Sequence, residues 1–245
     1  MKFDEQLLQI TIVIPTFNEK DNISLIINSI RHSLKPYAWK IIFVDDDSAD
    51  GTASCIQKIS KTDQQICCIK RIGKRDLSSA CVEGILASTS PYVAVIDADM
   101  QHDESILPNM LEHMAEGKYD LVIGSRYTED GSTGNLTIIR VYISKLATRL
   151  GRIIINKDVS DPMSGFFLIK KEFFNKIHSK LSIKGYKILL DILASSDEDI
   201  KILEIPYVMR TRQNGVSKLN ILVVWQYFIL IADKFFERFF PTKHQ

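Results

Sequence analysis

Two aspartates, Asp97 and Asp99, directly follow the apolar run 93–96. The run is short, β-branched and uninterrupted, which indicates a buried parallel strand. Alternate side chains share one face of a strand, so we expect both carboxylates to point the same way at its C-terminal end, where open α/β sheets bind ligands. Two like charges side by side need a counter-charge, and a hard divalent cation that also binds substrate phosphates supplies it. Because the pattern alone is common, a pair of solvated acids remains the alternative.

Other acids and bases gather at the ends of other predicted elements. Glu19 follows the first predicted strand, and the three aspartates 45–47 follow the second. In a parallel sheet these ends lie along one edge. Acids, a divalent ion and separate basic groups suit a diphosphate leaving group and a second anion. Four basic residues lie in loops or at a helix start that could face the same cleft: Arg126, Arg140, Arg212 and Lys218.

Strands and helices must alternate to position these groups. Short β-branched runs predict strands at 10–15, 41–44, 66–70, 93–96 and 120–124, and helical spacing predicts helices at about 23–34, 52–60, 76–87 and 103–116. This alternation predicts an α/β fold with a parallel sheet and right-handed crossovers. The second half is less regular. We expect there a loop at 131–137, a helix at 140–155, strands at 166–169 and 200–209, a helix carrying Asp191 between those strands, and a helical tail at 219–240.

Composition sets limits on the class of protein. The 245 residues, 45% hydrophobic and 25% charged, suit one large or two small globular domains. A formal net charge of +1 gives no global attraction to nucleic acid. The four cysteines lack metal-type spacing and suit a reducing cytosol. We expect no signal peptide at the start and no spanning helix, since a span needs about 18 uninterrupted apolar residues.

Eight motifs cover nearly the whole chain: IVIPTFNE, VDDDSADGT, LSSA, VIDADMQH, IGSRY, DPMSGFF, GYKILLD and RQNGVSK. Together and in this order they resemble family 2 glycosyltransferases of the GT-A fold, and among them the polyprenol-phosphate (dolichol-phosphate) mannosyltransferases. The resemblance implies a GT-A (Rossmann-like), mostly parallel sheet flanked by helices, with a catalytic domain at 1–218 and an apolar C-terminal helical tail at 219–245. One departure is Asp76, which stands where the family often has Gly before its Leu-Ser-Ser-Ala turn.

The resemblance implies an inverting, metal-dependent transfer of a hexosyl group, with mannose from GDP-mannose expected, onto polyprenyl or dolichyl monophosphate to give a β-linked product. The implied catalytic residues are Asp97, Asp99 and Arg126, and the implied ligands of Mg²⁺ or Mn²⁺ are Asp97, Asp99 and Gln101. The implied nucleotide-sugar contacts are Pro15, Phe17, Glu19, Val44, Asp46, Asp97, Ala98, Asp99, Arg212 and Lys218. The implied acceptor-phosphate contacts are Arg126, Arg140 and Ser144. We expect His102 to support the metal motif and Asp191 to be structural or a positioning group.

Several alternatives remain open. The donor could be UDP-glucose or another UDP-sugar, because the nucleoside pocket is not resolved by sequence alone. A non-catalytic nucleotide-sugar-binding scaffold is a second alternative, although the intact acids and bases argue against it. Response-regulator receivers and haloacid-dehalogenase phosphatases also carry acid clusters. In receivers the cluster follows the first strand, and in the phosphatases Asp-x-Asp lies on the first strand, whereas here these acids come later in the chain.

The tail is predicted to meet a membrane surface. Residues 219–232, about 14 and mostly apolar, suit an interfacial or buried helix rather than a span. The charged and aromatic residues that follow, up to Pro241, suit the headgroup region. With a lipid acceptor implied, we expect a peripheral protein on the cytoplasmic face of a membrane, with an integral membrane partner as a further candidate. The alternative is a tail that packs on the catalytic domain or forms a dimer.

Overall fold

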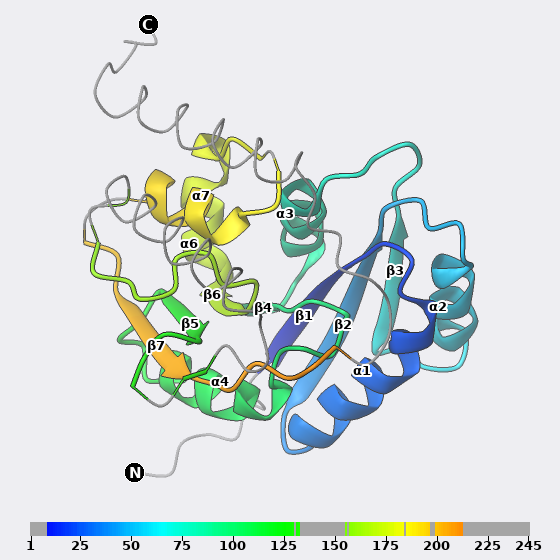
Figure 1. Cartoon of the computed structure of the whole chain (residues 1–245), viewed down its shortest axis with the longest axis horizontal. Helices are drawn as coiled ribbons and strands as arrows, with labels where there is room; N and C mark the ends of the chain where they lie inside the picture. The colour runs from blue at the N-terminus through cyan, green and yellow to red at the C-terminus, as the bar shows by residue number, and fades with distance from the viewer. Residues whose placement is uncertain are drawn as a thin grey trace, which may run out of the picture.

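One mixed sheet lies at the centre of the structure, which is a computed structural model describing residues 9–129, 131–132, 155, 157–183, 185–196 and 199–212. Within these residues the strand order is β3-β2-β1-β4-β6-β5-β7 (Figure 1). β6 pairs antiparallel with both β4 and β5, and all other pairs are parallel. The predicted α/β fold with a mostly parallel sheet is confirmed. The strands are β1 Gln9–Thr16, β2 Ala38–Asp45, β3 Ile66–Lys70, β4 Tyr92–Val95, β5 Leu121–Ser125, β6 Phe167–Lys170 and β7 Ile202–Pro206.

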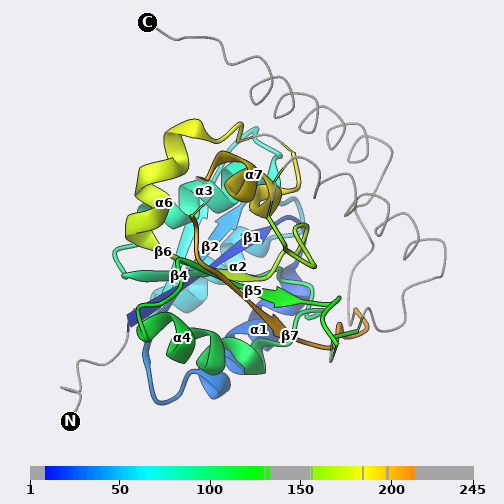
Figure 2. The same cartoon turned by 90° about the vertical axis from the view of Figure 1, so that its left-hand side faces the viewer.

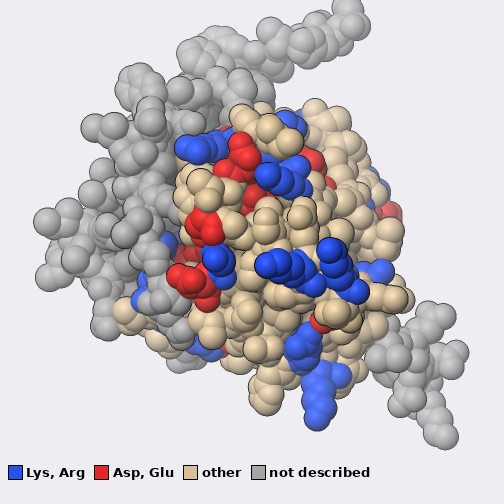
Figure 3. Space-filling model, turned by 90° about the vertical axis from the view of Figure 1, so that its right-hand side faces the viewer, with Lys and Arg blue, Asp and Glu red and all other residues tan. Residues whose placement is uncertain are grey.

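Helices cover both faces of the sheet. Figure 2 shows α1 and α4 on one side of it and α3, α6 and α7 on the other. On the face seen in Figure 3, basic and acidic side chains lie side by side. The helices α6 and η2 were not predicted from the sequence. The helical elements are α1 Lys20–Ser33, α2 Thr52–Ser60, α3 Leu77–Ala87, η1 Glu104–Ile106, α4 Leu107–Ala115, α6 Lys171–Ile177, η2 His178–Lys180 and α7 Ile188–Ser195.

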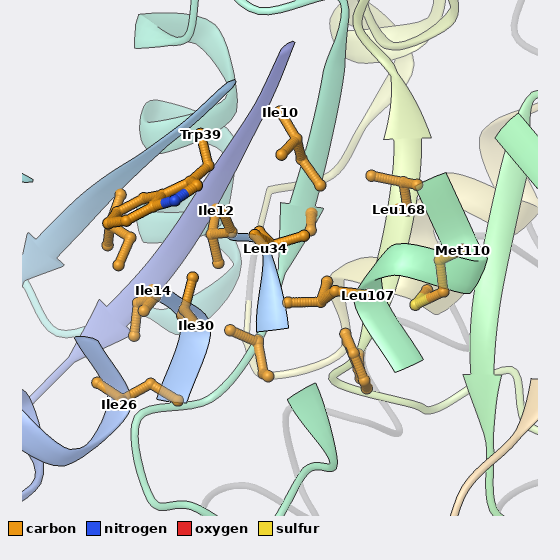
Figure 4. Packing of buried hydrophobic residues seen from close by; sticks show 14 of the residues in the cluster. Ile10, Ile12, Ile14, Ile26, Ile30, Leu34, Trp39, Leu107, Met110 and Leu168 are labelled. Carbon is orange, nitrogen blue, oxygen red and sulfur yellow. The ribbon is translucent and has the colours of Figure 1, made fainter. Parts of the chain in front are cut away.

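The alternation of side chains along β1 explains the two layers of helices. Ile10, Ile12 and Ile14 lie in the core that β1 shares with α1 and α4 (Figure 4). Val13 points to the opposite face, where it belongs to the core formed with α3, α6 and α7. Successive side chains of a strand point to opposite faces, so a run with apolar residues at both odd and even positions is buried on both sides. Each such isoleucine contributes about 1.5–3 kcal/mol by burial.

Asp76, which departs from the family pattern, begins α3. It is the N-cap residue, and its Oδ1 accepts a hydrogen bond from Ser79 N at 2.8 Å. Its Oδ2 accepts a second bond from Gly185 N at 2.6 Å, and so ties α3 to the segment before α7. A side-chain cap of this kind stabilises a helix by about 1 kcal/mol. The aspartate therefore has a structural role that glycine would not supply.

Several sequence predictions fall outside the described residues. These are the helix at 140–155 apart from Ile155, the residues Arg140, Ser144 and Lys218, most of the loop at 131–137, and the tail at 219–245. Among the residues that are described, no helix is long and apolar enough to cross a bilayer.

Candidate active site

The predicted residues that follow β1, β2 and β4 lie where the sheet reverses its strand order. From β1 the chain builds β2 and β3 on one side, and then places β4 on the other side of β1. Such a reversal opens a crevice at the carboxyl ends of the two central strands. Pro15 pairs with Val44, and Asp46 N donates to Thr16 O at 2.9 Å, so the ends of β1 and β2 lie together. Ile96 N donates to Val13 O at 3.2 Å, which brings the exit of β4 to the same place.

Unusual backbone conformations gather in these loops. Asn18, Asp47 and Met100 follow β1, β2 and β4, with φ angles of 54°, 57° and 62°. Asn and Asp tolerate the left-handed region, but Met does so only at a cost of about 1–2 kcal/mol. Such conformations concentrate at functional sites, where the surrounding structure maintains them. The loops at the crevice are therefore shaped by more than local preference.

Asp97 and Asp99 differ in environment. β4 ends at Val95, one residue before the predicted end, so the alternation of a strand does not set the directions of the two carboxylates. The side chain of Asp99 is 10% exposed and that of Asp97 is 37% exposed. Burial, followed by the negative charge of Asp97, raises the pKa of the Asp99 carboxyl above its usual range. Asp99 is thus the carboxylate that most needs a positive partner.

Arg212 supplies that positive charge. Its Nη2 lies 2.6 Å from Asp99 Oδ2 and 3.2 Å from Gln101 Oε1. One cationic nitrogen therefore contacts two of the three residues that the sequence assigned to a metal ion. Carboxylate and amide oxygens around a single cation fit Mg²⁺ or Mn²⁺, which take further oxygens from phosphates and water. Within the described residues, no cluster of three or more His, Cys, Asp or Glu side chains forms a metal site.

His102 supports Asp97 from the buried side. Its Nδ1 accepts a hydrogen bond from Asp97 N at 3.3 Å, and its Nε2 lies 3.9 Å from Asp97 Oδ2. Burial lowers the pKa of His102 to about 4, so the ring is neutral near pH 7. Because Nδ1 is the acceptor, the proton is on Nε2, which faces the Asp97 carboxylate. The ring also stacks on Phe166 with 5.5 Å between centroids. These contacts agree with the supporting role expected for His102.

Gly165 allows this arrangement. A Cβ atom at this position would lie 2.9 Å from Asp97 Oδ2 and 3.2 Å from His102 Cε1. In the DPMSGFF motif, Gly165 therefore leaves room for the Asp97 carboxylate to pack directly against the backbone. Ser164 beside it is buried, and its Oγ donates to Gly124 O at 2.7 Å, which ties the motif to β5.

The residues predicted to hold the nucleoside line the exits of β1 and β2. Val44 is fully buried and Glu19 nearly so. The Oε2 of Glu19 accepts a hydrogen bond from Asn22 Nδ2 at 2.7 Å. Phe17 is partly exposed, and the guanidinium carbon of Arg75 lies 4.5 Å from the centroid of its ring. Arg75 was not identified from the sequence, yet it lies against the residue proposed as a wall of the nucleoside pocket.

Each carboxylate oxygen of Asp46 accepts a hydrogen bond from within the protein. Its Oδ1 accepts a hydrogen bond from Arg71 Nε at 2.6 Å, and its Oδ2 accepts one from Asp76 N at 2.9 Å. Burial raises the pKa of Asp46, although the hydrogen bond and charge of Arg71 act in the opposite direction. Asp46 therefore anchors the loop after β3 at the edge of the site. Arg71 was missed because nothing in its local sequence identifies its partner 25 residues away.

Arg126 makes a buried bidentate ion pair. Its Nε and Nη2 donate to the two carboxylate oxygens of Asp161 at 2.7 and 2.8 Å. Burial lowers the pKa of Arg126, but the hydrogen bonds and charge of Asp161 outweigh it and raise the pKa above the ordinary value. Within the described part of the chain, Nη1 makes no hydrogen bond. Contact of Arg126 with a second anion is therefore left to Nη1 and to the second N–H of Nη2.

One further group near this pair was not assigned from the sequence. Lys187, from the GYKILLD motif, interacts electrostatically with Arg126, Asp161 and Asp97, and burial followed by the charge of Arg126 lowers its pKa. Asp191 is buried, and its Oδ2 accepts a hydrogen bond from Ile183 N at 3.0 Å, so it is structural as expected. Ala98, an expected donor contact, is buried in the turn between Asp97 and Asp99.

Residues 11–178 match the family described as "Glycosyl transferase family 2". Three relatives carry the name dolichol-phosphate mannosyltransferase. The protein from Pyrococcus furiosus is 34% identical over 90% of this chain, which spans 62% of that relative's length. The protein from Saccharomyces cerevisiae is 29% identical, over 95% of this chain and 89% of the relative. The protein from Mycosarcoma maydis is 30% identical, over 94% of this chain and 80% of the relative.

Solved structures share the fold at lower identity. Mannosyl-3-phosphoglycerate synthase from Rubrobacter xylanophilus superposes with a TM-score of 0.70 at 17% identity, covering 97% of this chain and 77% of the other. Glucosyl-3-phosphoglycerate synthase from Mycobacterium tuberculosis, in complex with Mn²⁺, UDP-glucose and phosphoglyceric acid, gives 0.65 at 18% identity, covering 94% of this chain and 79% of the other. These likenesses confirm the predicted GT-A architecture.

Proposed function

This chain belongs to glycosyl transferase family 2, and from that membership we propose that it transfers mannose from GDP-mannose to the phosphate of a polyprenyl or dolichyl lipid. The names of the three relatives support mannosyl transfer and a dolichol-phosphate acceptor. The observation that carries the proposal is the contact of Asp99 and Gln101 with one cationic nitrogen at the exit of β4. The carboxylate oxygen of Asp99 and the amide oxygen of Gln101 can bind a divalent ion, and the adjacent guanidinium of Arg212 can bind a phosphate. Together they suit a site for a metal-bound diphosphate.

The metal and the donor are assigned to neighbouring parts of the crevice, because Arg212 contacts Asp99 and Gln101. Asp99 and Gln101, with Asp97 beside them, would hold Mg²⁺ or Mn²⁺, and the ion when bound neutralises charge on the departing diphosphate. Pro15, Phe17, Glu19, Val44 and Asp46 are assigned to the nucleoside, and Ala98, Arg212 and Lys218 to the rest of the nucleotide-sugar. The Mn²⁺ and UDP-glucose bound by the Mycobacterium tuberculosis enzyme support a metal-dependent site on this fold.

The acceptor needs to be held more than activated. A phosphate monoester is already ionised near neutral pH, so the reaction needs no strong general base. The N–H groups of Arg126 that do not bind Asp161, on Nη1 and Nη2, are assigned to this phosphate together with Arg140 and Ser144, because arginine binds phosphate by paired hydrogen bonds. A phosphate oxygen attacks the anomeric carbon from the face opposite the diphosphate. The new C–O bond forms as the bond to the nucleoside diphosphate breaks, so an α-linked donor gives a β-linked product. Holding the two anions in line supplies much of the rate.

A ligand panel tests this assignment. GDP with Mn²⁺ should raise the melting temperature more than UDP with Mn²⁺, because a ligand that binds only the folded state stabilises it by mass action. GDP-mannose and polyprenyl phosphate should then give lipid-linked mannose. Greater stabilisation by UDP would transfer the proposal to a UDP-sugar donor. Stabilisation without turnover on any lipid phosphate would favour the non-catalytic scaffold, and no stabilisation by any nucleotide would refute the donor site.

We further propose that residues 219–245 form an interfacial helical tail on a catalytic domain at 1–218, which places the enzyme on the cytoplasmic face of a membrane. The lipid acceptor and the aromatic and charged residues of the tail support this. Replacing Phe235, Phe236, Phe239 and Phe240 by Ser should release the protein from liposomes in a flotation assay, while stabilisation by GDP and Mn²⁺ is retained as the control. Undiminished flotation would show that the tail is not the anchor. Dependence of flotation on an integral membrane partner is tested by adding membranes from which proteins have been stripped.

A further inference from the structure

The segment that leaves β7 is tied to the turn that carries the candidate metal ligands. Arg210 N donates to Gln101 O at 2.8 Å, and Gln101 Nε2 donates to Arg210 O at 3.3 Å. Two backbone groups of Arg210 are therefore bonded to a single residue of the 99–101 turn. The two segments are more than 100 residues apart in sequence, so the contact is made by the fold and not by local preference.

The side chain of Arg210 binds two carboxylates that follow the 99–101 turn, those of Asp103 and Glu104. Its Nη1 lies 2.8 Å from Glu104 Oε2 and 3.0 Å from Oε1, and its Nη2 lies 2.5 Å from Asp103 Oδ1. A guanidinium that binds both oxygens of one carboxylate and an oxygen of a second is held in orientation as well as in position. We refer to Arg210 with Asp103 and Glu104 as the Arg210 clamp.

The carboxylates of the clamp are themselves fixed in the fold. Glu104 has a side chain that is 5% exposed, and it also accepts a hydrogen bond from Ser29 Oγ on α1. Asp103 is the N-cap of η1, and its Oδ1 accepts hydrogen bonds from Ser105 N at 3.1 Å and Ser105 Oγ at 2.6 Å. A buried carboxylate without a counter-charge is strongly unfavourable, so Glu104 holds Arg210 in place. The clamp thus connects the exit of β7 to both α1 and η1.

Arg212 lies two residues beyond this anchor. Two residues of extended chain span at most about 7 Å, so fixing Arg210 on Gln101 confines the region that Arg212 can reach. Within that region Arg212 contacts Asp99 and Gln101. The chain therefore leads from a rigid clamp directly to the guanidinium assigned to the donor diphosphate.

We propose that Arg210 is a positioning residue for nucleotide-sugar binding. Its clamp holds residues 208–212 against the 99–101 turn. Arg212 is therefore already positioned for the donor diphosphate before the donor binds. This rests on the proposed function, which supplies the diphosphate and the divalent ion, and it adds residues that touch neither. Without the clamp, ordering the segment would draw on the binding free energy, and affinity would fall in proportion to the fraction of molecules with the segment in place.

Three variants separate positioning from plain stability. Arg210→Ala removes the clamp, Arg210→Lys keeps the charge but loses the fork, and Glu104→Gln keeps the shape but loses the partner charge. Arg31→Ala is the matched control, because Arg31 makes a 2.5 Å pair with Asp63 on the surface of α1 with a side chain 48% exposed. The measurements are the Kd of GDP with Mn²⁺ by calorimetry, KM and kcat for donor and acceptor, and hydrogen exchange of the Arg210 amide.

Arg210→Ala should raise both the Kd for GDP with Mn²⁺ and the donor KM roughly tenfold, leave kcat within about twofold, and leave the acceptor KM unchanged. Arg210→Lys and Glu104→Gln should lie between Arg210→Ala and the unaltered protein, and Arg31→Ala should behave as the unaltered protein. The Arg210 amide should exchange faster in Arg210→Ala. If Arg210→Ala fails to fold, the other two variants carry the same test.

An unchanged Kd in folded Arg210 variants would overturn the proposal. A fall in kcat that matches the fraction of unfolded protein, with donor and acceptor affected equally, would also overturn it. That result is expected of a residue that only stabilises the fold. If the unaltered protein binds no nucleoside diphosphate, the proposed function fails instead. Hydrogen exchange then still decides the clamp, because faster exchange in Arg210→Ala supports it and unchanged exchange overturns it.

Discussion

The guanidinium of Arg212 lies 2.6 Å from the carboxylate of Asp99, and so provides at that position the positive charge that sequence analysis assigned to a divalent ion. The same nitrogen reaches Gln101 Oε1 at 3.2 Å. A guanidinium and a metal ion cannot both occupy this position, so binding of the ion requires Arg212 to move. The diphosphate that arrives with the ion offers the displaced guanidinium a new anionic partner.

Replacing Arg212 should therefore change metal and nucleotide affinity in opposite directions. In Arg212→Ala without nucleotide, Mn²⁺ should bind several-fold more tightly, because a competing cation is gone. In the presence of Mn²⁺, GDP should bind more weakly, because a cationic contact to the diphosphate is lost. Paramagnetic resonance titration of free Mn²⁺ and calorimetry with GDP measure the two effects. Weaker Mn²⁺ binding in the variant would contradict the exchange of guanidinium for metal.

Replacing Asp99 should strongly reduce metal-dependent turnover. Asp99→Asn should lose on the order of 10²-fold or more in turnover, as for removal of a main group that stabilises charge in the transition state. In the unaltered enzyme, a chelator should stop turnover and added Mg²⁺ or Mn²⁺ should restore it. Asp21→Asn, on the exposed side of α1, is the control and should be fully active. Turnover that persists in chelator would remove the metal from the mechanism.

The pair of Arg126 and Asp161 should contribute strongly to stability. Asp161 is fully buried, so Asp161→Asn leaves Arg126 without its counter-charge and should lower the free energy of unfolding by about 3–5 kcal/mol. Asp63→Asn, which breaks the exposed pair with Arg31, should cost no more than about 1 kcal/mol. Urea unfolding measures both. Equal losses in the two variants would show that the buried pair is no stronger than a surface one.

Because Arg126 is paired with the buried Asp161, the choice of variant that tests the acceptor site is restricted. Reversing the charge of Arg126 would place two carboxylates against each other in the interior, so Arg126→Lys is the usable substitution. It keeps the charge but loses the fork, and should raise the KM for polyprenyl phosphate while the Kd for GDP changes little. An unchanged acceptor KM would exclude Arg126 from the acceptor site.

Gly165→Ala should impair activity more than stability. The added methyl would lie 2.9 Å from Asp97 Oδ2 and would push that carboxylate away from its position. We expect kcat/KM to fall about tenfold or more, since small displacements of reacting groups are costly. Gly117→Ala is the control: its φ of 78° makes the substitution strained, but Gly117 precedes β5 at the opposite edge of the sheet. The control should lose stability and keep its kcat/KM, and a similar activity loss in both would contradict a local effect.

His102 should make the metal-free protein less stable in mild acid. Its pKa is about 4 in the fold, because of burial, against 6.5 when exposed. Between those values the unfolded chain binds a proton that the folded chain does not, so stability falls as the pH drops from 6.5 toward 4. The full shift corresponds to roughly 3 kcal/mol. His102→Gln should be less stable at neutral pH but should show a flatter dependence between about pH 7 and pH 5 in urea unfolding. Parallel curves for the two proteins would contradict the assignment.

Much of the architecture follows from local sequence patterns. The bounds of α2 and β3 agree with the sequence prediction, because helical and strand periodicity report directly whether each side chain faces the core. The placement of Asp46, Asp97 and Arg126 at the exits of β2, β4 and β5 is likewise confirmed. Local patterns are weaker where the chain turns: β4 ends at Val95 and not beside Asp97, and α6 and η2 were missed.

What only the tertiary structure decided is which charged groups meet. Asp46 pairs with Arg71, Arg126 with Asp161 and Arg210 with Glu104, across 25, 35 and 106 residues of chain. Asp46 and Arg126, which the motifs assign to ligands, are also bound by partners within the protein. The antiparallel β6 between β4 and β5 was equally invisible, although it sets where Gly165 approaches Asp97. Periodicity encodes the burial of a side chain, whereas its partner depends on strand order and on the path of distant loops, which no local pattern contains.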